Sequence, residues 1–166
     1  MVVAAAVAEW SDFFVAQVGA SAVLAGLVFV GVSINIDQVM TYARLPGRAL
    51  EAMTLLILVL VVGSLFLIPS QSLRVLGVEV LLAAVAFWAI VTRVQLDVYR
   101  KTEHQYRRTL AAQIGVGQAA IAAFVVTGVV LLASGENGVY WTVPGILLCY
   151  LTAVTDAWVL LIEIRR

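Results

Sequence analysis

The sequence predicts an all-α integral membrane protein, a helical bundle with five transmembrane helices that form a single transmembrane domain over residues 1–166. Three observations lead to this prediction. Hydrophobic residues make up 63% of the chain and the mean hydropathy is +1.06, which is more apolar surface than a chain of this length can bury in water. Charged residues, at 12%, leave five long apolar stretches between them. Turn-forming residues separate several of these stretches.

Each apolar stretch is long enough to cross a membrane, because about 20 apolar residues span about 30 Å of hydrocarbon. The first stretch lies between Asp12 and Asp37 without a charged residue inside it. The second starts near Glu51 and ends at the turn sequence of residues 68–72, so the third must run antiparallel to it. We expect the five spans at about 13–36, 50–69, 73–94, 110–133 and 143–164.

The third and fourth helices are expected to continue beyond the lipid. Neither glycine nor proline occurs between Val78 and Ile114, and we place the reversal of the chain near residues 100–105. The fourth span ends at the polar turn of residues 134–138, and Pro144 then opens the fifth helix.

The basic residues predict how the bundle is oriented. Of the ten Lys and Arg residues, only Arg74 falls in the second connection, and none falls in the fourth. The others lie in the first and third connections or in the C-terminal tail. Basic residues near span ends stay in the cytoplasm. We therefore expect a multi-pass protein of the bacterial plasma (inner) membrane, with the N-terminus outside and the C-terminus cytoplasmic.

Two carboxyl side chains fall well inside predicted spans, away from the span ends. Asp156 is near the middle of the fifth span, and Glu79 is about one and a half turns into the third. A charge at the bilayer centre costs about 2.5 to 3.5 kcal/mol or more, so each carboxyl must be neutral, paired or hydrated. Thr152 shares a helical face with Asp156. These three residues are candidates for binding an ion or a proton. Alternatively, Asp156 makes a structural hydrogen bond to a neighbouring helix.

Amide and small residues mark candidate contact surfaces on the first and fourth spans. Such residues pack helices or subunits in lipid, and in an oligomeric ring they could instead line a pore. Either interpretation predicts self-association. The candidates are Gln17, Ser21, Gly26, Asn35 and Gln113.

A basic cluster in the third connection is a candidate binding surface for anionic lipid or for an acidic partner segment, at about 1 kcal/mol per residue near the membrane surface. Its members are Arg100, Lys101, Arg107 and Arg108. The alternative is that these charges serve only to orient the protein.

The residue types and motifs of the chain give little support to a catalytic or cofactor-binding function. His104 is the only histidine and Cys149 the only cysteine, which excludes a bis-histidine haem and a disulfide within one chain. No zinc-protease, nucleophile-elbow, phosphate-loop or dinucleotide motif is present. The zero net charge gives no bias towards nucleic acid. We therefore expect no enzymatic activity, no catalytic or metal-binding residues, no cofactor and no nucleic-acid partner.

Four segments carry a resemblance to known proteins. Phe13–Ser21, Gly26–Ile36, Leu45–Ala49 and Ile68–Ser72, about the first half of the chain, resemble a group of small polytopic membrane proteins of bacteria, particularly actinobacteria. Some members are labelled as modulators of the membrane protease FtsH. The resemblance implies an accessory role and assigns no functional residue.

Two functions are therefore expected. The first is a non-enzymatic accessory or modulatory subunit that acts through helix–helix contacts with a membrane protein partner and through self-association. The alternative is a small oligomeric ion channel or proton-coupled transporter in which Asp156 binds the cation or proton.

Overall fold

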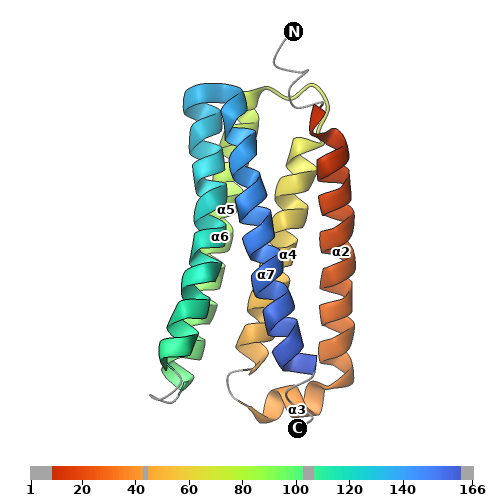
Figure 1. Ribbon diagram of the computed structural model, residues 1–166, viewed down its shortest axis with the longest axis vertical. Helices are drawn as coiled ribbons and strands as arrows, with labels where there is room; N and C mark the ends of the chain where they lie inside the picture. The colour runs from red at the N-terminus through yellow and green to blue at the C-terminus, as the bar shows by residue number, and fades with distance from the viewer. Residues whose placement is uncertain (1–8, 43–44, 103–106, 162–166) are drawn as a thin grey trace.

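A computed structural model describes residues 9–42, 45–102 and 107–161 (Figure 1). These residues form six α-helices and one 3-10 helix, and no strand occurs among them. In chain order the elements are α2 (Ser11–Ile34), α3 (Ile36–Thr41), α4 (Leu45–Phe66), α5 (Leu73–Lys101), α6 (Arg107–Ser134), the 3-10 helix η2 (Gly135–Trp141) and α7 (Thr142–Leu161).

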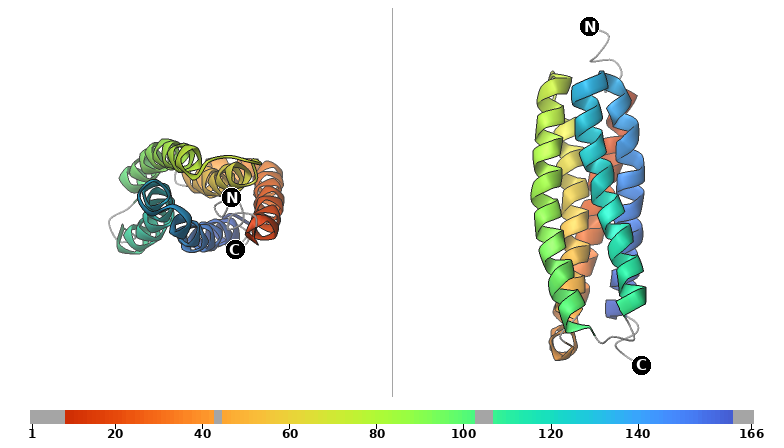
Figure 2. Two further views of the ribbon diagram at one scale, coloured as in Figure 1. Left: turned by 90° about the horizontal axis from the view of Figure 1, so that it is seen from above. Right: turned by 90° about the vertical axis from the view of Figure 1, so that its left-hand side faces the viewer.

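The five long helices run up and down side by side, so that successive connections lie at opposite ends of the bundle (Figure 1). We call these ends the η2 end, which also holds the start of α2 and the α4–α5 turn, and the α3 end. Viewed along the bundle, α4 and α5 form one row and α6 and α7 the other, while α2 packs beside α4 and α7 (Figure 2).

The predicted fold class is confirmed. Five helices are long and apolar enough to cross a membrane, and each overlaps one of the five predicted spans. The expected extension of the third and fourth helices is also found, because α5 reaches Lys101 and α6 already begins at Arg107. The chain is thus built as a multi-pass helical bundle. Which end faces the cytoplasm remains a prediction.

The second helix begins earlier than predicted. We expected it from about residue 50, whereas α4 starts at Leu45 and contains Pro46 in its first turn. Proline is compatible with that turn because its missing N–H would have no helical partner there. Arg48, predicted to lie in the first connection, is therefore inside the helix, and so is Glu51.

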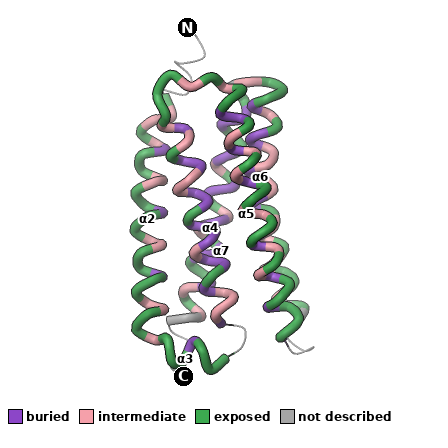
Figure 3. The backbone as a smooth tube through the Cα atoms, turned by 180° about the vertical axis from the view of Figure 1, so that it is seen from behind, coloured by how far each residue is buried: buried purple, intermediate pink, exposed green. Residues whose placement is uncertain are grey.

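Burial differs sharply among the helices. In α4, 61% of the most apolar window is buried inside the bundle, whereas in α2 the share is 17%. The backbone view coloured by burial shows the same contrast, with α2 mostly exposed (Figure 3). α4 is therefore the central helix, and α2 is a peripheral one that meets the bundle along a single narrow face.

The half of the bundle near the η2 end is packed through apolar contacts and close backbone approach. Phe14 of α2 stacks on Phe66 of α4 with ring centroids 4.3 Å apart. α5 and α6 meet at Gly77 and Gly128, where a Cβ on Gly128 would lie 3.0 Å from the backbone nitrogen of Leu81 and 3.1 Å from the Gly77 carbonyl oxygen. Only glycine fits there without moving one helix.

Candidate functional site

The half of the bundle near the α3 end contains an ion pair between two helices. Nε and Nη2 of Arg48 in α4 both donate to Oδ1 of Asp156 in α7, at 2.9 and 2.6 Å. The side chains are only 12% and 7% exposed. Since an unpaired charge at such a position is costly, each residue serves as the counter-ion of the other. The ion pair explains why a carboxylate at position 156 is tolerated inside a predicted span.

A second carboxyl belongs to α4 itself, about one helical turn after Arg48. Oε1 of buried Glu51 accepts a hydrogen bond from Nε2 of buried Gln95 in α5, at 2.6 Å. Gly117 of α6 lies against this contact, and a Cβ added to it would be 2.9 Å from both the Gln95 nitrogen and the Glu51 oxygen. The glycine therefore provides the space in which these side chains meet.

The hydrogen bonds continue from Gln95 into α6. Nε2 of Gln118 donates to Oε1 of Gln95 at 2.6 Å, and Oε1 of Gln118 accepts from the indole Nε1 of Trp88. An indole N–H can only donate, so it fixes the orientation of the Gln118 amide, which in turn fixes that of Gln95. The amide of Gln95 consequently presents a donor to Glu51.

Together these residues form a buried hydrogen-bonded site to which four helices contribute. We define the polar cluster as Arg48, Glu51, Gln95, Gln118 and Asp156. Two of its members belong to α4, and α5, α6 and α7 supply one each. Glu51 also interacts electrostatically with Arg48 and Asp156, which connects the ion pair to the amide chain.

Three predicted site residues come together beside the ion pair. Thr152 is buried one turn from Asp156 and donates its hydroxyl to the Leu148 carbonyl at 2.9 Å. Gln113 of α6 faces them across a cavity of about 180 Å³. The cavity is lined by Gln113, Val116, Leu151, Thr152, Thr155 and Asp156.

Glu79, the other predicted carboxyl, is remote from this site. It lies near the start of α5, at the η2 end, and its Oε2 accepts a hydrogen bond from the side-chain amide of Gln71. Asp156 binds Arg48 towards the α3 end instead. The two carboxyls therefore do not form a pair within one chain.

The four candidates of the first helix do not converge on one site. Ser21 is buried and donates to the Val18 carbonyl, whereas the Gln17 carbonyl accepts from the Tyr150 hydroxyl at 3.0 Å. Asn35 ends α2, and its amide donates to the carbonyl of Gly31. Gly26 faces outwards, with no heavy atom within 4 Å of where its Cβ would be. In a single chain, then, Gly26 contributes no helix contact.

The basic residues of the third connection gather at the α3 end. Arg100 and Lys101 close α5 and are exposed, and Arg108 is exposed in the first turn of α6. Lys101 binds Asp97 at 2.6 Å. Arg107 begins α6, and its side chain lies outside the described residues. Their binding of anionic lipid remains a prediction.

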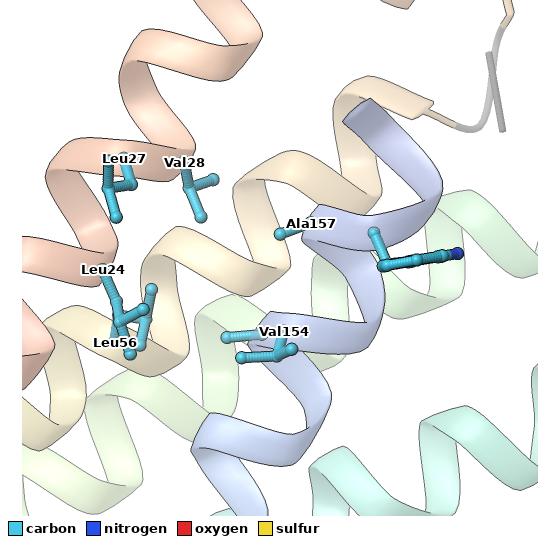
Figure 4. Close-up of a pocket in the computed structure, with 8 residues that line it drawn as sticks. Leu24, Leu27, Val28, Leu56, Val154 and Ala157 are labelled. Carbon is cyan, nitrogen blue, oxygen red and sulfur yellow. The ribbon is translucent and has the colours of Figure 1, made fainter. Parts of the chain in front are cut away.

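An apolar groove runs between α2, α4 and α7, with a volume of about 260 Å³ (Figure 4). Its lining is made entirely of apolar side chains apart from the indole of Trp158, namely Leu24, Leu27, Val28, Leu56, Ala153, Val154, Ala157 and Trp158. The groove shows that α2 and α7 are incompletely packed against each other.

Of the polar cluster, only Asp156 is among the predicted site residues. Arg48 belongs to the predicted first connection, Glu51 lies at the predicted start of the second span, and Gln95 falls just beyond the predicted end of the third span at residue 94. A usable signal was present, because Trp88, Thr92 and Gln95 follow the spacing of one helical face. Since the third helix is itself expected to continue beyond residue 94, this polar stripe could have been placed inside the bundle.

Fold and site together define a polytopic helical membrane protein with a buried polar cluster at one end. No group of three or more His, Cys, Asp or Glu side chains able to hold a metal occurs among the residues that the structure describes. Comparison of the chain with protein-family models, curated proteins and solved structures gives no match.

Proposed function

We propose that the protein is a non-enzymatic accessory or modulatory subunit of the bacterial inner membrane that acts through helix–helix contacts and self-associates. The observation that carries this proposal is the outward face of α2. Its residues recur at alternating steps of three and four, the spacing of a helix-pairing seam. All of them are exposed: Ala16, Gly19, Val23, Gly26 and Val30.

Small residues give this face its capacity for close contact. Gly19 and Gly26 are seven residues apart, which places them on one side of the helix, and neither has a heavy atom within 4 Å of its Cβ position. In lipid, where no hydrophobic force drives helices together, small residues allow the backbone approach that stabilises association. The α2 face therefore suits a second transmembrane helix, either from another copy or from a partner.

The polar cluster supports the same proposal because its groups find their partners within one chain. Asp156 already has Arg48 as counter-ion, and the amides of Gln95 and Gln118 are bonded to neighbours inside the bundle. These groups hold α4, α5, α6 and α7 together. The outer helix surfaces remain as the part of the described molecule that is free to bind.

The test compares two glycines that both face open space. Gly26→Ile fills the α2 face, whereas Gly115→Ile adds the same side chain to α6, where the Cβ position also has no heavy atom within 4 Å. Energy transfer between labelled full-length copies in lipid vesicles measures association. We expect Gly26→Ile to weaken it about tenfold, equivalent to about 1.4 kcal/mol, and Gly115→Ile to leave it unchanged. Equal behaviour of the two variants would refute the α2 interface.

A channel or proton-coupled transporter is the second candidate, favoured by the cavity that Asp156, Thr152 and Gln113 share. Against it, the guanidinium of Arg48 already neutralises the carboxylate of Asp156, with two hydrogen bonds to Oδ1. The measurement is ion or proton flux through vesicles containing the purified protein. Flux that Asp156→Asn abolishes while helical content is retained would replace the accessory proposal.

Two classes of partner belong to the proposal. Arg100, Lys101, Arg107 and Arg108 would bind anionic lipid headgroups at the α3 end, on the cytoplasmic side of the predicted topology. A membrane protease of the FtsH class is the protein partner that the sequence resemblance suggests. Co-reconstitution of the two, with proteolysis of a membrane substrate as readout, tests it: an unchanged rate would exclude modulation.

A further inference from the structure

The polar cluster contains one more acid than base. Arg48 is its only cation, and Asp156 and Glu51 are its two carboxyl groups, all with most of their surface inside the bundle. If both carboxyls were ionised, the cluster would hold one uncompensated negative charge among packed helices. Such a charge is expensive in a low-dielectric region, and binding one proton removes it.

The hydrogen bonds indicate which carboxyl takes that proton. Asp156 accepts two bonds from a guanidinium, and charge-assisted bonds of this kind hold the carboxylate form. Glu51 accepts a bond from the neutral amide of Gln95, which a protonated carboxyl accepts equally through its carbonyl oxygen. Of the two acids, Glu51 therefore gains more by protonation.

The surroundings of Glu51 contain no further charge among the described residues that pack against it. Gln95 of α5 donates to it and Gly117 of α6 lies against it, and the charges that act on it are those of Arg48 in α4 and Asp156 in α7. We propose that Glu51 is a proton-binding site, which holds the single proton shared by this three-residue charge cluster. The O–H bond breaks when the proton passes to water, and Glu51 is left as a carboxylate with no change in oxidation state.

Loss of the proton has a structural consequence. The new carboxylate of Glu51 is three residues from Arg48 on the same helix, within the spacing at which helical side chains pair. It then competes with Asp156 for the one guanidinium. The bond between α4 and α7 thereby becomes dependent on protonation, a property that goes beyond the proposed accessory function and does not require it.

Infrared spectroscopy of the full chain in vesicles of uncharged lipid tests the site, because the C=O stretch of a carboxylic acid is distinct from carboxylate bands and shifts in D₂O. At neutral pH we expect the wild type to show a protonated-carboxyl band that Glu51→Gln abolishes. Asp156→Asn should abolish it as well, since Arg48 then pairs with Glu51. Glu79→Gln, the matched control at the other end of the bundle, should retain it.

Two results would overturn the proposal. One is a wild-type spectrum without a protonated carboxyl, which would mean that the cluster carries a net negative charge. The other is a band that persists in Glu51→Gln. Glu51→Asp covers the case in which Glu51→Gln does not fold, because it keeps a carboxyl and should shift the band; an unshifted band would equally overturn the assignment.

Discussion

The two halves of the bundle are stabilised by different means. Near the η2 end, rings and glycines fit closely, as where Phe14 stacks on Phe66 and α5 meets α6 at Gly128. Near the α3 end, α4, α5, α6 and α7 are joined by an ion pair and a chain of amides. Apolar side chains distinguish little between lipid and protein, so the first half depends mainly on the close fit of its side chains and backbones. The second half depends on every polar group having its partner.

This contrast implies different responses to damage. A packed contact loses stability in proportion to the fit that is lost, whereas a buried polar cluster fails abruptly when one member leaves another without a partner. The free energy of unfolding in mixed detergent micelles can compare the two halves directly.

Removal of Arg48 should have the largest effect. Arg48→Met leaves the Asp156 carboxylate unpaired, and breaking a buried ion pair from one side costs about 3 to 5 kcal/mol. Arg48→Met combined with Asp156→Leu removes both charges and should recover most of that loss. If the double variant were no more stable than the single one, the ion pair would not be the origin of the effect.

The second-largest loss of stability should come from a larger side chain at the glycine contact between α5 and α6. In Gly128→Val the new side chain meets the backbone of α5, and forced separation of packed elements costs about 1 to 3 kcal/mol. Gly115→Val is the control, because its site on the same helix is open. Similar losses from both would indicate an effect of valine on the helix and not of the α5–α6 contact.

The sequence predicted the fold because lipid imposes a simple length rule on apolar stretches. It located Asp156 as an exceptional residue for the same reason. Glu51 and Arg48 were not predicted because one lies at the predicted start of the second span and the other just before it, where charge is ordinary. The start of α4 at Leu45 places both within the helix. Pairing partners also depend on which helices are neighbours, and periodicity within a helix carries no such information.

The amide chain allows a subtler test of the polar half. Trp88→Phe removes the donor that orients Gln118 but retains the aromatic ring. Polar contacts between membrane helices are worth about 0.6 kcal/mol on average and at most about 1.7 kcal/mol, so we expect a loss in that range. Trp158→Phe is the matched control, since this tryptophan is exposed at the apolar groove. Equal losses from the two variants would mean that the amide chain does not contribute to stability.

The smallest effect should come from the exposed ion pair at the end of α5. Lys101 and Asp97 are four residues apart, about half exposed, and joined by one bond of 2.6 Å. Water and salt screen such a pair, so Lys101→Gln should cost about 0.3 to 0.5 kcal/mol or less, and added salt should reduce the difference. The buried pair of Arg48 and Asp156 should keep its effect in salt. A salt response of the same size at both sites would mean that solvent reaches the polar cluster, and the distinction between a dry and a wet ion pair would be lost.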